Sequence, residues 1–155
     1  MPNNLFPKLN TPDYSDQIKV RKSGHDSYEI YDSIRHQWVV LTPEEWVRQN
    51  MTLYIAERLE LPVTRFAIEA QIEYNGLKKR CDTIIYDERI KPMIIVEYKQ
   101  PKVEITQRTF DQVAVYNMKL NVPYLIVSNG LQHYMCQVDI ERRRYVFTDK
   151  LNYYG

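Results

Sequence analysis

Residues 77–99, LKKRCDTIIYDERIKPMIIVEYK, hold the pattern from which the fold is predicted. Residues 77–86 follow an Asn75-Gly76 turn signal and read as a strand that runs back from it, and the charged residues 87–89 end that strand. Residues 93–99 begin with an unbroken apolar run, which is typical of a strand buried on both faces. We therefore expect two neighbouring strands of one sheet.

The segment before the turn, residues 66–74, alternates apolar and polar residues, which indicates a half-buried strand. Its apolar members are expected to share one face of the sheet: Phe66, Ile68, Ala70, Ile72 and Tyr74. With the two strands above, this segment makes a three-stranded meander.

A helix is predicted to begin just upstream of that meander. Thr42 is a good N-cap, Pro43 suits the first helical position, and Glu45 completes a capping box with Thr42. The residues that follow at helical spacing form one apolar stripe: Val47, Met51, Tyr54, Ile55 and Leu59. Leu61-Pro62 is expected to end the helix.

The remaining elements are a second helix from Thr106 to about Leu120 and several strands. The predicted strands are residues 27–32 and 36–41 as an N-terminal hairpin, 123–128 as a buried strand, and 131–138 with 143–148 as a closing hairpin. This order predicts an α/β fold: a mixed β-sheet flanked by helices, with an N-terminal β-hairpin. We expect residues 1–26 to be an irregular leader and residues 27–155 to be a single domain.

The composition of the chain excludes several classes of protein. The chain has 155 residues, 44% of them apolar and 26% charged, as in an ordinary globular domain. It has no apolar run of about 20 residues and no signal-peptide pattern, so we expect no membrane contact. Cys81 and Cys136 form no CxxC pair, and with the missing signal peptide this predicts a cytoplasmic protein. The net charge of +1 restricts nucleic-acid binding to local patches, of which residues 78–80 and 142–144 are candidates, although solvated turns would have the same composition.

The absence of several sequence motifs excludes further kinds of catalytic and cofactor site. The sequence has neither a GxxxxGK loop nor a GxGxxG loop, so no nucleotide cofactor is expected. It has no GxSxG elbow, and His25, His36 and His133 show no zinc-binding spacing.

An acidic pattern remains. Glu97 and Lys99 lie two residues apart on one face of their strand, and Asp82 can lie beside Glu97 if the two strands are neighbours. Carboxylates at a strand end, together with the carbonyl of Tyr98, can hold Mg²⁺ or Mn²⁺. A metal there would assist phosphodiester hydrolysis, with Lys99 placing the water or contacting the phosphate. The alternative is a plain ion pair, although charged groups after an apolar run are costly to bury unless they are paired or bind a metal.

The arrangement of Asp82, then fourteen intervening residues, then Glu97-Tyr98-Lys99 resembles the PD-(D/E)XK nuclease superfamily. Residues 40–140 resemble, more closely, the N-terminal nuclease domain of type I restriction enzyme R subunits. The resemblance implies a restriction-endonuclease-like fold, with Asp82 and Glu97 as metal ligands and Lys99 as the catalytic lysine. Cys81 stands where the superfamily has its eponymous proline.

The same resemblance assigns residues around the acids. Gln112 and Tyr116 match a QxxxY motif beside the site, where they would contact nucleic acid or brace the catalytic strand; ordinary helix packing is the alternative. The resemblance also matches Glu45 to an additional acid near the metal. From the basic patch, Lys79 and Arg80 are candidates for nucleic-acid contacts or for support of the site.

These observations predict a Mg²⁺-dependent endodeoxyribonuclease whose partner is DNA. Its protein partners would be a second copy of the chain or other restriction-modification subunits. The alternative is a non-catalytic nucleic-acid-binding or assembly module on the same fold, since the sequence carries no ATP-driven translocase segment. A third reading is a protein-interaction domain in which the thirteen tyrosines, Trp38 and Trp46 form the interface.

Overall fold

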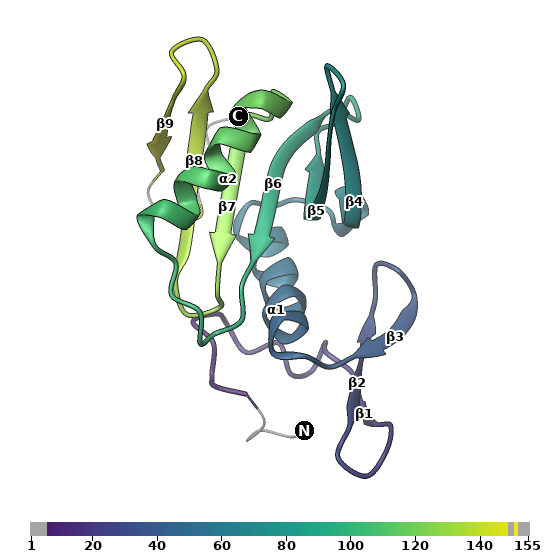
Figure 1. Cartoon of the computed structure of the whole chain (residues 1–155). Helices are drawn as coiled ribbons and strands as arrows, with labels where there is room; N and C mark the ends of the chain where they lie inside the picture. Colours follow the sequence, from purple (N-terminus) through teal and green to yellow (C-terminus); the bar gives the residue numbers. More distant parts are fainter. Residues whose placement is uncertain (1–5, 149–150, 152–155) are drawn as a thin grey trace.

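The computed structural model describes residues 6–148 and residue 151. Its strands form two sheets (Figure 1). In chain order the elements are β1 (Val20–Lys22), β2 (Tyr28–Asp32), β3 (Gln37–Val40), α1 (Pro43–Arg58), the 3-10 turn η1 (Val63–Arg65), β4 (Phe66–Tyr74), β5 (Leu77–Tyr86), β6 (Pro92–Tyr98), α2 (Gln107–Leu120), β7 (Tyr124–Ser128), β8 (His133–Asp139) and β9 (Arg144–Phe147).

The larger sheet has six strands in the order β4-β5-β6-β7-β8-β9. Its neighbours are antiparallel except β6 and β7, which run parallel from Ile94↔Tyr124 to Tyr98↔Ser128. A parallel pair needs a crossover connection, and α2 supplies it. The mixed sheet flanked by helices is therefore confirmed, as are the meander and the closing hairpin.

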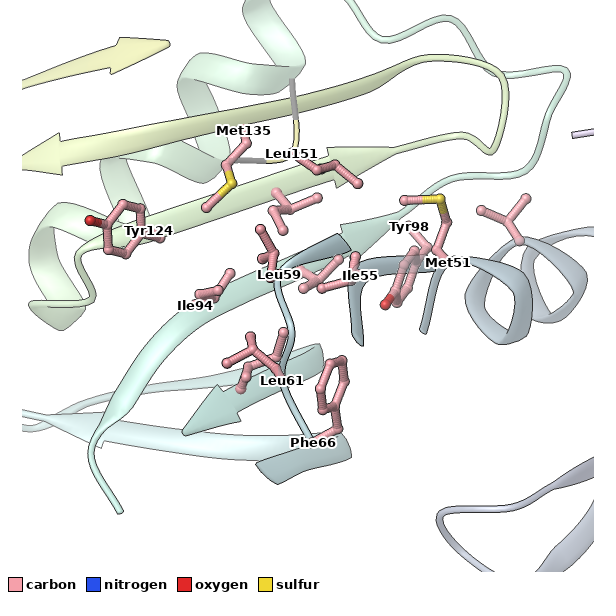
Figure 2. Packing of buried hydrophobic residues seen from close by; sticks show 14 of the residues in the cluster. Met51, Ile55, Leu59, Leu61, Phe66, Ile94, Tyr98, Tyr124, Met135 and Leu151 are labelled. Carbon is pink, nitrogen blue, oxygen red and sulfur yellow. The ribbon is translucent and has the colours of Figure 1, made fainter. Parts of the chain in front are cut away.

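The two helices cover opposite faces of the larger sheet. Ile94 and Val96 of β6 pack in one buried cluster with residues of α1, whereas Ile95 packs in another cluster with Phe110 and Ala114 of α2. Figure 2 shows the α1-side cluster around Ile94. Both faces of β6 are thus covered, as its unbroken apolar run predicted.

The start of α1 is confirmed and its capping box is only half formed. The Thr42 hydroxyl accepts a hydrogen bond from the Glu45 backbone N–H at 3.0 Å. The Thr42 N–H instead donates to the Val40 carbonyl at 3.1 Å, and the Glu45 carboxylate binds the Arg48 side chain. The helix ends at Arg58, before the predicted Leu61-Pro62.

The prediction that the apolar residues of β4 share one face is wrong. Phe66 packs in the α1-side cluster, but Ala70 and Ile72 pack in the α2-side cluster. Between them the β4–β5 ladder omits Glu69, which has a φ of 49°, and Asp82 across from it. A residue with a left-handed backbone conformation rotates the strand that follows it. In the part of the hairpin nearer the turn, the side chains that alternation alone would direct to α1 therefore face α2.

The smaller sheet confirms the N-terminal hairpin and extends it. β2 and β3 pair as predicted, and β1 adds a third strand inside the segment that was expected to be irregular. The three residues Val20–Lys22 were too few to show a period. Further upstream, the Asn10 N–H donates to the Gly130 carbonyl at 2.8 Å, so this segment is bound to the turn between β7 and β8. No helix among the described residues has the length and hydropathy to span a bilayer.

Candidate metal and nucleic-acid site

The candidate site lies where β5 and β6 separate. Their ladder ends at the Thr83↔Val96 pair, and the next residue on each strand is an acid, Asp82 on β5 and Glu97 on β6. Oδ2 of Asp82 accepts a hydrogen bond from the Tyr98 backbone N–H at 2.9 Å, which holds this carboxylate against β6. The structure therefore brings the two predicted carboxylates together, at a place where they are not committed to the ladder.

Glu97 is largely enclosed by the protein. Its side chain is 15% exposed, and Oε1 accepts from the Lys79 Nζ at 2.8 Å. Burial, and after it the Asp82 carboxylate, raise the pKa of Glu97 to about 7 against the opposing effect of Lys79. Two acids held close together out of water favour a positive charge between them.

Lys79 reaches Glu97 because of the interruption in the β4–β5 ladder. In the part of β5 that precedes Asp82, residues 77–81, the odd-numbered side chains face α2, as the packing of Cys81 in the α2-side cluster shows. Lys79 lies on that side, and its Nζ is 5.1 Å from the centre of the Tyr116 ring of α2. Lys79 thus connects β5, β6 and α2.

The helix α2 presents Tyr116 and Gln112 on its exposed side, four residues apart. It is held to the sheet by a residue that the sequence reasoning missed. Asn117 is fully buried, and its Nδ2 donates to the Tyr124 carbonyl at 3.0 Å. The sequence offered a signal in its spacing, since Asn117 follows the apolar Phe110 and Ala114 at helical intervals.

The start of α1 approaches the same acids through Glu44. Burial raises the pKa of Glu44, the Asp82 carboxylate raises it too, and Lys99 acts in the opposite direction. Glu45, the acid matched to the family from the sequence, binds Arg48 and also accepts from Gln49 at 3.1 Å. Of the two glutamates in this turn, Glu44 is therefore the one whose pKa is shifted by the charges of Asp82 and Lys99.

Lys99 and Tyr98 occupy the end of β6. The Lys99 N–H donates to the Ser128 carbonyl at 2.8 Å, which anchors the backbone to β7 while the half-buried side chain lies near Glu44. The Tyr98 side chain is 2% exposed and packs beside Met51 in the α1-side cluster (Figure 2). The backbone of Tyr98, and not its phenol, is thus the part that a ligand at the acids could use.

The structure does not bring Arg80 to the acids. Its side chain is 72% exposed and pairs with Glu69 at 3.1 Å. The second basic patch, on the β8–β9 turn, is partly neutralised, because Arg142 and Arg144 lie 3.8 Å and 3.7 Å from Asp139.

A cavity of about 340 Å³ lies elsewhere, between the N-terminal segment and α1. Trp46, Tyr14 and Leu9 contribute to its lining, and none of the site acids does. The candidate metal site is therefore separate from this cavity.

Within residues 6–148 and 151, no three histidine, cysteine, aspartate or glutamate side chains gather closely enough to hold a metal by themselves. The donors present are the carboxylates of Asp82 and Glu97 and the carbonyl of Tyr98. This all-oxygen set fits Mg²⁺, which binds through one or two carboxylates and keeps several waters. The raised pKa of Glu97 agrees with a place for a cation.

A family model described as the type I restriction enzyme R protein N terminus matches residues 43–151 of the chain. The matched span begins at the first residue of α1 and includes both carboxylates and Lys99. No curated protein and no solved structure matches the chain.

Proposed function

The chain belongs to the family of type I restriction enzyme R protein N termini, and on that premise we propose that it is a divalent-metal-dependent endonuclease domain that hydrolyses DNA phosphodiester bonds. DNA and the other subunits of a restriction-modification system are its proposed partners. The family gives the chain a role related to restriction enzymes; the reaction and the metal are our proposal.

The observation that carries the proposal is the pair of acids at the end of the β5–β6 ladder. Asp82 and Glu97 are one residue beyond the last paired position, and Glu97 has a pKa raised to about 7 by burial and by the Asp82 charge. An acid with this environment destabilises the fold at neutral pH, so a functional role accounts for it better than a structural one.

We assign roles to the residues around the acids as follows. Asp82, Glu97 and the Tyr98 carbonyl hold Mg²⁺ or Mn²⁺, which when bound neutralises phosphate charge and acidifies a water. Lys99 orients the attacking water or contacts the scissile phosphate. Glu44, which lies near Asp82 and Lys99, replaces Glu45 as the additional acid.

Around this centre, Lys79, Tyr116 and Gln112 form the side that we assign to nucleic acid. Tyr116 is 44% exposed and Gln112 is exposed, so both can reach a bound strand. Arg80 contributes only as a surface charge, because it lies with Glu69. Positive charge at phosphates supplies most of the affinity of such a surface.

A second candidate function is a binding or assembly module without catalysis. The observation that favours it is the Lys79–Glu97 ion pair, because a lysine that already neutralises the carboxylate removes part of the need for a metal. DNA binding that is sensitive to salt, is unaffected by metal and is accompanied by no cleavage would support this candidate.

The test is a cleavage assay on single-stranded, duplex and branched DNA with Mg²⁺ or Mn²⁺. We expect Glu97→Gln and Lys99→Met to reduce cleavage by about 100-fold or more. Glu88→Gln and Lys102→Met are matched controls on exposed residues and should keep wild-type activity.

Manganese binding measured by calorimetry gives a readout that does not depend on the right substrate. The wild type should bind Mn²⁺ and Glu97→Gln should not. Equal Mn²⁺ affinity in both proteins would contradict the metal assignment and leave the binding module as the better account.

A further inference from the structure

Lys79 is much less exposed than its neighbours Lys78 and Arg80, and its ammonium group has different partners. Its side chain is 18% exposed and its Nζ lies 2.8 Å from Oε1 of Glu97. The side chains of Lys78 and Arg80 are 63% and 72% exposed and pair with acids of β4. One charge of this basic patch is therefore directed to the acids.

Lys79 also has a second partner within reach. Its Nζ is 5.1 Å from the centre of the Tyr116 ring, a distance at which a cation is attracted to the face of an aromatic ring. The four-carbon stem of lysine is flexible, so its ammonium group can move between two partners without movement of the backbone.

A divalent ion and an ammonium group compete for the same oxygen atoms of Glu97. When a metal takes Oε1, the ammonium group loses its ion pair but keeps the attraction of the Tyr116 ring. Tyr116 is 44% exposed, so a charge held there lies at the surface of the protein, where a phosphate can approach it.

We propose that Lys79 is a built-in counter-ion of Glu97, a positioning residue that neutralises the carboxylate until a divalent ion displaces it and then turns its charge toward a DNA phosphate. This inference rests on the proposed function, because it requires a metal at Glu97. It links the two parts of the site: metal loading frees a positive charge on the surface that binds nucleic acid.

The first test is calorimetric titration of the whole chain with Mn²⁺. Lys79→Met removes the competing charge and keeps an apolar stem of similar length. We expect it to bind Mn²⁺ about tenfold more tightly than the wild type. Lys78→Met, the matched control, changes an exposed charge and should stay within about twofold of the wild type.

The second test measures duplex DNA affinity in Ca²⁺ across a range of salt concentrations. Lys79→Met should bind DNA more weakly than the wild type, and its log-log salt slope should be smaller by about 0.9, which corresponds to one lost phosphate contact. A structural role for Lys79 would not produce tighter metal binding together with weaker DNA binding.

The outcomes separate the two proposals. If Glu97→Gln abolishes Mn²⁺ binding but a folded Lys79→Met protein binds Mn²⁺ no more tightly than the wild type, the counter-ion role is wrong and the proposed function stands. If Glu97→Gln keeps wild-type Mn²⁺ affinity, the proposed function fails and this inference fails with it. Circular dichroism checks the fold of each variant, and Lys79→Gln serves if Lys79→Met is unfolded.

Discussion

At the scale of single residues, Glu44 and Glu45 are neighbours in sequence with different surroundings. Successive residues of a helix point about 100° apart, so one of the two can face the site while the other faces along α1. Glu45 lies three residues before Arg48, a spacing that allows the ion pair seen in the structure. Glu44 is left toward Asp82 and Lys99. One position along the helix thus separates an acid that is paired with Arg48 from an acid that lies toward Asp82 and Lys99.

This difference predicts that two similar substitutions affect different properties, protein stability for Glu45 and metal binding for Glu44. Glu45→Gln should lower the free energy of unfolding by about 2 kcal/mol, because it removes one of two acids that neutralise a buried arginine. Glu44→Gln should change stability by less than about 0.5 kcal/mol and weaken Mn²⁺ binding instead. Urea unfolding and metal titration of both variants check this, and reversed phenotypes would contradict it.

The sequence predicted Asp82, Glu97 and Lys99 as a set because alternation and strand order are local patterns. From the sequence, Glu45 and not Glu44 was predicted as the additional acid, because the difference between them depends on Arg48, which a buried aspartate of β2 also binds. Arg48 lies 2.8 Å from Asp32, whose side chain is 1% exposed. Arg48, the partner of Glu45, is therefore held in position by a contact between α1 and β2, two segments that are distant in sequence.

At the scale of elements, the interruption in the β4–β5 hairpin determines which side chains reach α2. Glu69 has a φ of 49° and, with Asp82, is absent from a ladder that otherwise continues from Ile68↔Thr83 to Ala70↔Cys81. Period-two alternation alone places Asp82 in an ordinary ladder position.

Substitutions at Glu69 test the importance of this backbone conformation. Glu69→Val should destabilise the protein by about 1–2 kcal/mol, because a β-branched residue is strained at positive φ. Glu69→Asn removes the same carboxylate but tolerates this conformation, so it should cost less than about 0.5 kcal/mol. Chemical unfolding of the pair separates backbone strain from lost ion pairs, and equal losses would mean that the ion pairs dominate.

At the scale of the whole molecule, two sets of contacts join the N-terminal region to the larger sheet. Arg35 of the β2–β3 turn binds both Asp32 and Glu69, at 2.6 Å and 3.2 Å, which ties the smaller sheet to β4. His133 of β8 binds the Asn10 carbonyl through Nε2 at 2.7 Å and Ser128 through Nδ1 at 2.8 Å. Since a carbonyl only accepts, Nε2 carries the proton and Nδ1 accepts from the hydroxyl.

This neutral histidine predicts a pH dependence of stability. Burial lowers the pKa of His133 below its ordinary value, so the unfolded chain binds the proton more readily than the folded one. The contribution of His133 is therefore fully present above about pH 6.5 and is lost as the pH falls below that value. His133→Gln can keep both hydrogen bonds without a titrating group. The free energy of unfolding of the wild type minus that of His133→Gln should fall between pH 7 and pH 5, and a constant difference would contradict the prediction.

The sequence by itself determined the order of the α-helices and of the strands from β2 onward, the start of α1 and the buried strand β6, and it predicted Asp82 and Glu97 as candidate site acids. These depend on periodicity, capping and turn residues, which act over a few neighbouring positions. Three residues were too few to mark β1. Only the tertiary structure decided that Glu44 lies toward Asp82 and Lys99, that Lys79 and not Arg80 reaches Glu97, and that Asn117 is buried. The physical reason is that each of these depends on the direction of a side chain relative to a partner distant in sequence, and one left-handed residue, Glu69, changes that direction while the pattern of apolar residues stays the same.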